Sequence, residues 1–400
     1  MNARKRLEVM VVDDSAVVRQ LLKTLLEREG DIVVTTAADP LIARNKLRHK
    51  RPDVLLLDIE MPRMNGLRFL QEIMAENPLP VVMCSSHVAQ GTRHALEAMA
   101  LGAVDIILKP EMRVREFLEE SRITISDVVR AAACARVRPR EAASSTARLP
   151  ERPPVQNVPK PVGPAAGSHE PVVAIGASTG GPGILAQVIG ELPADVPPIL
   201  IVQHIPRTFS ANFAQNLGRH ARIEVREAVD GDQLRRNLAL VAPGGQHMVI
   251  AHRDRGHCVR ILDGPLVSRH RPSVDVLFSS VAEQASPDSL GIILTGMGND
   301  GVEGLLQMRE AGMTTIAQDR RSCVVFGMPK EAIASGAAIH ELDLVEISRA
   351  IEECRCSAGG WNPAFSATER TRRRRLLFAK GTGRWKTLDR LGPNDREPVR

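Results

Sequence analysis

Residues 174–181, AIGASTGG, place a serine in a glycine-rich turn directly after a short apolar run. The stretch Gly176–Gly180 matches G-x-S-x-G, the strand-to-helix turn that exposes a serine nucleophile above a sheet. Pro182 suits the first turn of a following helix, whose N–H groups would point toward Ser178. The motif is short, however, and a phosphate-binding turn explains it about equally well.

A dinucleotide-binding turn makes further demands on the sequence. It needs G-x-G-x-x-G and, about 20 residues later, an acidic residue at the end of the next strand for the ribose. Gly181-Pro182-Gly183 gives only a displaced partial match, and the next apolar run, 198–202, ends in Gln203-His204 instead of an acid. The sequence therefore lacks the acidic residue that a dinucleotide-binding site requires.

A serine at its ordinary pKa needs a base, and the base needs an orienting partner. His204 alone among the eleven histidines ends a fully apolar strand of this predicted sheet, and GIILTGMGNDG supplies Asp300 after another apolar run. Singly, His204 could be structural and Asp300 could cap a helix expected at Val302–Arg309. Together with Ser178 they predict acyl transfer. The order Ser, His, Asp excludes the standard α/β-hydrolase scaffold but not the chemistry.

A second group of polar residues follows the apolar runs near the N-terminus. Asp13 and Asp14 come after the first run, Asp58 after the third, Ser85 ends the fourth and Lys109 ends the fifth. The carboxyl ends of parallel strands meet at one edge of an open sheet, and three converging carboxylates call for a divalent cation, best Mg²⁺. Any one Asp alone is better explained as a helix cap, but the set predicts a phosphoryl site.

Two alternating patterns of apolar runs and amphipathic stretches position these residues. In the first half the runs are Val9–Val12, Ile32–Thr36, Val54–Leu57, Val81–Cys84 and Val104–Leu108, with helices expected at Val17–Leu26 and Leu67–Ile73. In the second half they are Val172–Ile175, Ile199–Val202, Leu238–Ala242, Met248–Ala251, Val259–Leu262, Gly291–Leu294 and Thr314–Ala317, with helices at Ile184–Leu192 and Val274–Ala285. Strands apolar throughout indicate parallel sheets covered on both faces. Pro243-Gly244-Gly245 predicts a hairpin turn within the second sheet.

Composition divides the 400 residues further. Residues 138–167 are rich in Pro, Ala, Ser and basic residues, which predicts a semi-extended linker. Residues 357–400 hold 11 Lys+Arg and 4 Asp+Glu, so this tail has a net charge of +7 and the rest of the chain −1. Arg372–Arg375 with Phe378 and Trp385 could contact nucleic acid, but a solvated, disordered tail is the better interpretation. The six scattered cysteines predict reduced thiols and no structural metal.

The first half resembles the receiver domain of two-component response regulators through VVDDS, LLLDIEMPRMNG, VVMCSS and ILKP. The resemblance implies that Asp58 accepts a phosphoryl group, that Asp13 and Asp14 hold Mg²⁺ with it, and that Ser85 and Lys109 sense the phosphate. Receivers usually carry an aromatic residue three positions before the lysine, where this chain has Ile106. The switch is therefore expected to be weaker or to follow another route.

The second half resembles the catalytic domain of the chemotaxis protein-glutamate methylesterases of CheB type. The matching stretches are AIGASTGG, VQHIP, APGG, RPSVDVLF, LTGMGNDG and VVFGMP. The resemblance implies Ser178 as nucleophile, His204 as base and Asp300 as its orienter, with oxyanion donors at Met297 and in the Thr179 region. It further implies methyl esters and glutamine amides of chemoreceptors as substrates, a histidine kinase as phosphodonor, and no cofactor for the ester hydrolysis.

These inferences combine into one expected architecture of class α/β. We expect a doubly wound parallel receiver domain at 1–125, a helical extension and Pro-rich linker at 126–168, a mostly parallel methylesterase domain with an antiparallel hairpin at 169–355, and a basic tail at 356–400. No apolar run approaches the 18 to 20 or so residues of a membrane span, and Asp13 interrupts the run at Val9–Val12, so a cytoplasmic protein is expected. The alternative is a response regulator without catalysis that acts by phosphorylation-dependent docking.

Overall fold

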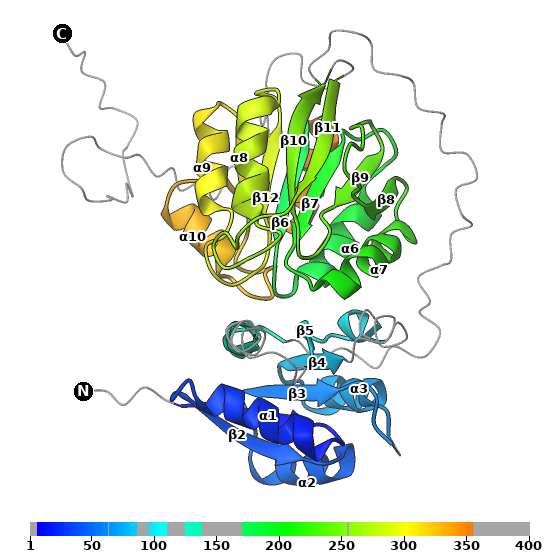
Figure 1. Cartoon of the computed structure of the whole chain (residues 1–400), viewed down its shortest axis with the longest axis vertical. Coiled ribbons are helices and arrows are strands. Elements are labelled where there is room, and N and C mark those ends of the chain that lie inside the picture. Colours follow the sequence, from blue (N-terminus) through cyan, green and yellow to red (C-terminus); the bar gives the residue numbers. More distant parts are fainter. Residues whose placement is uncertain are drawn as a thin grey trace, which may run out of the picture. The chain divides into compact units, whose positions relative to one another are not determined.

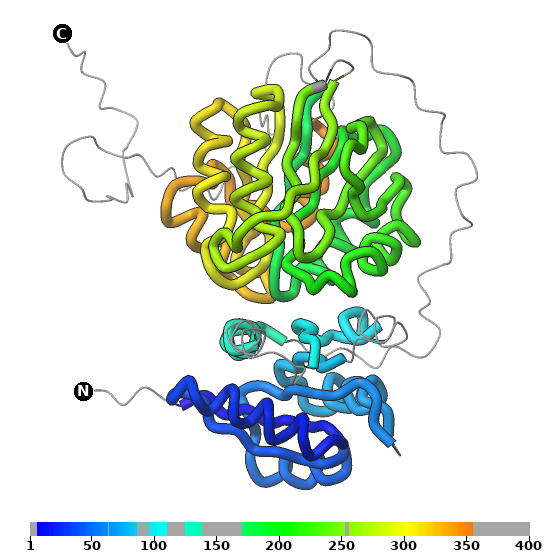
Figure 2. Tube along the Cα trace, viewed as in Figure 1, coloured from blue at the N-terminus to red at the C-terminus, as the bar shows by residue number. Residues whose placement is uncertain are grey.

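The computed structural model describes residues 6–62, 64–85, 94, 97–109, 125–137, 170–253 and 256–354. All of them belong to one compact unit, Met1–Trp361. The expected linker over 138–167 and the basic tail lie outside the described residues. Figure 2 follows the chain from the N-terminal sheet, in blue, to the C-terminal sheet, in green to orange.

The N-terminal half is a parallel five-stranded sheet in the order β2-β1-β3-β4-β5. Its strands are β1 (Leu7–Val12), β2 (Ile32–Ala37), β3 (Val54–Asp58), β4 (Val81–Ser85) and β5 (Asp105–Leu108), with helices α1 (Ala16–Glu27), α2 (Pro40–His49) and α3 (Gly66–Glu76). Side-chain oxygens of Ser15, Asp39 and Asn65 cap these helices, each accepting a backbone N–H that would otherwise be unpaired. The predicted doubly wound receiver fold is confirmed.

The C-terminal half contains a parallel seven-stranded sheet in the order β14-β13-β12-β6-β7-β9-β8. Its strands are β6 (Val173–Ala177), β7 (Ile199–Gln203), β8 (Glu224–Glu227), β9 (Leu238–Val241), β12 (Leu290–Ile293), β13 (Thr314–Gln318) and β14 (His340–Leu342). The two edge strands, β8 and β14, were not predicted. They are short and partly polar (EVRE and HEL), because an edge strand does not need the continuous apolar pattern of a buried one.

Helices cover both faces of this sheet. One face packs against α6 (Gly181–Glu191), α7 (Arg207–Gly218) and α11 (Leu344–Glu353) through side chains such as Val188, Phe213 and Ile347. The other packs against α8 (Val274–Gln284), α9 (Val302–Glu310) and α10 (Met328–Ala334) through Phe278 and Met308, among others. Figure 1 shows α8, α9 and the β10–β11 pair along one face of the sheet.

The antiparallel hairpin exists, but its predicted turn at Pro243–Gly245 is wrong. Strands β10 (His247–Arg253) and β11 (Gly256–Leu262) pair with each other in a separate two-stranded sheet. Pro243–Gly245 instead carries the chain from β9 of the large sheet to β10. Both a hairpin and a change of sheet need a glycine-permitted turn, and Gly245 has φ of 81°, so the local signal could not separate them.

Candidate active site

The strand order brings the three predicted catalytic positions to one edge of the sheet. Strand β6 lies between β12 and β7, so Ser178, Asp300 and His204 follow three adjacent strands. Ala177 and Gln203 are register partners, which places Ser178 beside His204, and the His204 N–H donates to Ala177 O at 3.1 Å. The condition on which the sequence prediction rested, that these strands are neighbours, is met.

The turn after β6 is closely packed. The Ser178 N–H donates to Thr295 O at 3.0 Å, and Gly180 adopts φ of 78°, a left-handed conformation that favours glycine. A Cβ on Gly296 would lie 2.7 Å from Ser178 Cβ, so the loop after β12 can approach the serine only without a side chain there. Ser178 is 9% exposed. The turn therefore fixes the backbone that carries the Ser178 hydroxyl.

Gln203 joins the serine and histidine loops, and the sequence reasoning did not identify it. Its buried amide donates to Ser178 O at 2.9 Å and to His204 O at 3.1 Å. The available signal was a polar residue ending an otherwise apolar strand. Because one side chain binds both carbonyls, the two loops keep a fixed separation.

His204 and Asp300 form a direct pair. His204 Nε2 lies 2.7 Å from Asp300 Oδ2, and both side chains are buried. His204 Nδ1 is also buried and has no hydrogen-bond partner among the described residues. An anionic Asp300 accepts the Nε2 proton, so Nδ1 is the nitrogen that carries the lone pair. The residues that the structure describes show no hydrogen bond between Ser178 Oγ and His204.

Asp300 directly precedes the N-cap of α9, but its side chain binds the N-terminus of α8. Ser273 Oγ donates to its Oδ1 at 2.7 Å, the Val274 N–H to its Oδ2 at 2.8 Å and the Asp275 N–H to its Oδ1 at 3.2 Å. Burial raises the pKa of Asp300, but His204 and these donors outweigh that effect and hold the pKa well below its usual range. Gly301, at φ of 91°, caps α9 instead. Asp300 is therefore a fixed anion that orients His204.

Ser273→Ala tests this support. The variant removes a buried hydroxyl that donates to Asp300, and a hydrogen bond to a charged group contributes about 1.5–3 kcal/mol. We expect a loss of stability of that order in thermal or urea unfolding. We also expect the kcat of the predicted acyl transfer to be roughly tenfold lower. A poorly oriented His204 raises the activation free energy, and each 1.4 kcal/mol or so costs a factor of ten in rate.

Ser280→Ala on α8 is the matched control, because Ser280 Oγ binds Ile250 N and Leu277 O and not Asp300. It should affect stability alone. An unchanged kcat in Ser273→Ala would contradict the support role.

Two backbone N–H groups occupy the positions predicted to bind an oxyanion. Among the described residues, the N–H groups of Met297 and Thr179 have no hydrogen-bond partner, whereas that of Ser178 is occupied by Thr295 O. A cavity of about 750 Å³ opens beside Met297–Asn299 and is also bounded by residues 323–327, Arg136, Arg320 and Lys330. Of the two predicted oxyanion positions, Met297 thus adjoins a space that could admit a substrate.

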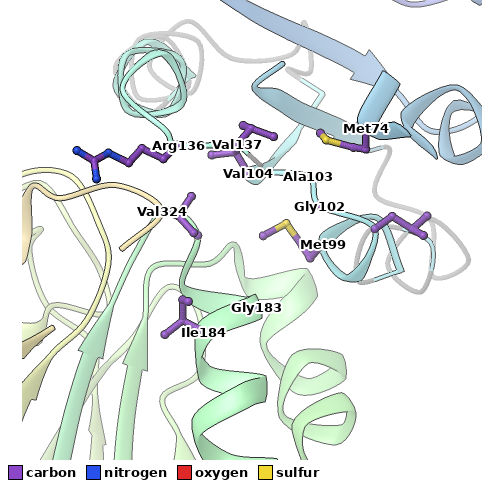
Figure 3. A pocket seen from close by; sticks show the side chains of 12 residues that line it. Met74, Met99, Gly102, Ala103, Val104, Arg136, Val137, Gly183, Ile184 and Val324 are labelled. Carbon is purple, nitrogen blue, oxygen red and sulfur yellow. The ribbon is translucent and has the colours of Figure 1, made fainter. Parts of the chain in front are cut away.

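The start of strand β5 and the residue before it, Val104, contact the serine turn. Thr179 Oγ1 donates to Asp105 Oδ2 at 2.7 Å, and the Gly180 N–H donates to Val104 O at 3.0 Å. Burial raises the pKa of Asp105 to about 6, against the opposing effects of Thr179 and the Ile106 N–H. A cavity of about 250 Å³ adjoins this contact. Figure 3 shows the side chains that line it, among them Val104, Met99, Ile184 and Val324.

The N-terminal acids form the predicted cluster. Ligand atoms of Asp13, Asp14 and Asp58 lie within 4.8 Å of one another. Lys109 Nζ lies 2.9 Å from Asp13 Oδ2 and 2.8 Å from Asp58 Oδ2. Burial raises the pKa of Asp58 to about 6, although Lys109 opposes the shift. Ser85 ends the adjacent strand, and its carbonyl accepts the Lys109 N–H at 2.9 Å. Three carboxylates with one cation leave the negative charge that a divalent ion would neutralise, so the residues fit Mg²⁺.

Within the described ranges, no helix is both long and apolar enough to cross a membrane.

Known proteins match both halves of the chain. Residues 9–120 match the response regulator receiver domain family, and residues 173–351 match the CheB methylesterase family. A protein-glutamate methylesterase/protein-glutamine glutaminase of Anaeromyxobacter dehalogenans is 52% identical over 346 residues, covering 86% of this chain and 97% of the relative. Proteins of the same name from Geobacter metallireducens and Pseudomonas syringae pv. tomato are 47% and 48% identical, each covering 87% of this chain and 98% of the relative. The chain therefore belongs to the CheB-type protein-glutamate methylesterase/protein-glutamine glutaminase family, in which a receiver domain regulates the catalytic domain.

Proposed function

We propose that this chain hydrolyses methyl esters on glutamate side chains of chemoreceptors, and deamidates their glutamines, with Ser178, His204 and Asp300 as its catalytic residues. The observation that supports this best is the pair between His204 Nε2 and Asp300, which leaves the buried Nδ1 as the basic nitrogen next to the serine turn. The names of the relatives supply the glutamate esters and glutamines of a protein substrate, and the resemblance to the chemotaxis methylesterases supplies the chemoreceptors.

In the proposed reaction, Ser178 Oγ attacks the side-chain carbonyl carbon while its proton passes to His204 Nδ1. Asp300 stabilises the imidazolium that forms. The N–H groups of Met297 and Thr179 hold the oxyanion, and losing one such donor typically costs about 2.7–4 kcal/mol in the transition state. His204 returns the proton to the departing methanol or ammonia. Water, deprotonated by the same nitrogen, then hydrolyses the acyl-enzyme and regenerates Ser178.

The receiver half supplies the regulation. Asp58 would accept a phosphoryl group from a histidine kinase, with Asp13, Asp14 and Asp58 holding the Mg²⁺ that neutralises the charge of the transferring group. Lys109 and Ser85 would bind the phosphoryl oxygens. The contacts of Asp105 and Val104 with Thr179 and Gly180 restrain the turn that carries the nucleophile. Phosphorylation would relax this docking, and each tenfold of activation requires about 1.4 kcal/mol of shifted preference.

The test is methanol release from a methylated chemoreceptor, with and without a small-molecule phosphodonor. We expect phosphodonor to stimulate the wild-type chain, and we expect removal of Mg²⁺ by a chelator to abolish the stimulation but not the basal rate. Asp58→Asn should behave like the chelated wild type. A chain that incorporates phosphate but releases no methanol would support the alternative, a regulator that acts only by docking.

A fragment spanning residues 168–400 tests the docking. Without Asp105 and Val104 to hold the serine turn, the fragment should release methanol without phosphodonor, and faster than the unphosphorylated full chain. Comparing initial rates at equal protein concentration measures the effect. A fragment no faster than the unphosphorylated full chain would show that the docking does not inhibit.

A further inference from the structure

A second imidazole lies flat against the proposed catalytic base. The ring centroids of His204 and His270 are 3.6 Å apart and the ring planes differ by 7°. The hydrogen bond to Asp300 fixes one atom of the His204 ring, Nε2, but does not by itself fix the plane of the ring about that atom. A flat ring in van der Waals contact with its face supplies the missing restraint.

The backbone that presents His270 is constrained to do so. Val267 and His270 exchange backbone hydrogen bonds of 3.1 and 2.8 Å, and the two residues between them, Ser268 and Arg269, have φ of 49° and 68°. Two successive left-handed residues that are not glycine are unfavourable and persist only where the surroundings impose them. This turn therefore holds His270 in one place at a local energetic cost.

Side-chain contacts tie the same turn to the elements around the catalytic pair. Ser268 Oγ donates to Asp275 Oδ2 at 3.1 Å, and Asp275 Oδ1 accepts the Gly304 N–H at 3.0 Å. The Gly245 N–H donates to Arg271 O at 3.0 Å. The turn is thus anchored to α8, which also binds Asp300, and to α9, so His270 and Asp300 share one support.

His270 is uncharged at neutral pH, as expected of a ring that takes no part in proton transfer. Burial lowers the pKa of His270 to about 3, and the nearby His204 and Arg269 lower it further, while Asp300 opposes the shift. His270 is therefore neutral at neutral pH and does not compete with His204 for the proton of the serine.

We propose that His270 is a positioning residue for the hydrolysis: its stacked ring holds the His204 imidazole in the plane that keeps Nε2 on Asp300 and Nδ1 free for Ser178. The proposal rests on the proposed function for its role in turnover, but the stacking can be tested without turnover. It requires the flat face of His270 and not its nitrogens.

The experiment compares His270→Ala with His270→Phe in the full chain, with His252→Ala, an exposed histidine of β10, as control. We expect His270→Ala to lower kcat for methanol release by roughly 10- to 100-fold, since small misplacements of a catalytic group have effects of this size, with KM within about threefold. His270→Phe, which retains a flat ring, should restore kcat to within about threefold, and the control should match wild type.

A second readout does not depend on activity. The proton shared by His204 Nε2 and Asp300 should give a downfield NMR resonance in the wild type and in His270→Phe, and a weakened or absent one in His270→Ala. An unchanged kcat in His270→Ala, or a His270→Phe variant as defective as His270→Ala, would overturn the proposal. If His270→Ala does not fold, a His270→Phe variant with a kcat more than about tenfold below wild type, or without the resonance, overturns the proposal. If the wild type releases no methanol, the proposed function fails, and the resonance alone decides whether the stack orients His204.

Discussion

Ser178→Ala is expected to reduce methanol release from methylated receptor by roughly 10⁴- to 10⁶-fold, the range in which loss of a serine nucleophile removes covalent catalysis. Oxyanion donors and substrate binding would account for the residual rate. Methanol release under saturating phosphodonor measures the effect.

The same variant should keep every property that belongs to the receiver half. Phosphorylation of Asp58, followed with a radiolabelled or fluorescence-monitored phosphodonor, should match the wild type, as should the thermal unfolding midpoint within a few degrees. Ser348→Ala on α11, which removes a hydroxyl that binds Leu344 O within the helix, is the matched control. Turnover of Ser178→Ala near the wild-type rate would refute the assignment of the nucleophile.

Asp300→Asn is expected to lower kcat by roughly 10⁴-fold, the loss seen when an orienting carboxylate becomes an amide and the histidine adopts the wrong tautomer. The amide nitrogen would replace one carboxylate oxygen and face groups that donate to it, either His204 Nε2 and the Val274 N–H at Oδ2 or the Ser273 hydroxyl and the Asp275 N–H at Oδ1. Burial of this site leaves those donors without water to replace the lost acceptor. Stability should therefore fall together with kcat.

The loss of stability in Asp300→Asn is expected to be larger at neutral pH than at acidic pH. The pKa of Asp300 is lower in the folded chain than its ordinary value, so its carboxylate stabilises the fold above an unfolded pKa of about 3.9, and the contribution is lost as pH falls through and below that value. The difference in unfolding free energy between wild type and Asp300→Asn should thus be larger at pH 7 than at pH 3. Asp263→Asn, at a surface carboxylate bound only by Gln246 among the described residues, serves as the control. An equal difference at both pH values would contradict the charge-stabilised role of Asp300.

Local sequence by itself determined the strand ends and the residue types that occupy them. Apolar runs bounded by Gly, Asp, His or Ser predict buried parallel strands, and parallel strands bring their carboxyl ends to one edge. Ser178, His204 and Asp300, and likewise Asp13, Asp58 and Lys109, could therefore be grouped before any coordinates were known. The edge strands β8 and β14 escaped this reasoning because their pattern is neither long nor apolar.

Tertiary structure alone decided what surrounds those strand ends. The order β12-β6-β7 made the three proposed catalytic positions adjacent, and the packing of α8 placed its N-terminus on Asp300. Gln203 became a bridge between two loops, and His270, 66 residues after His204, became its stacking partner. Such contacts depend on crossover connections and on how helices pack against the sheet. A local pattern fixes which face of an element is apolar but not which distant element covers it, so the sequence around these residues does not show which groups they contact.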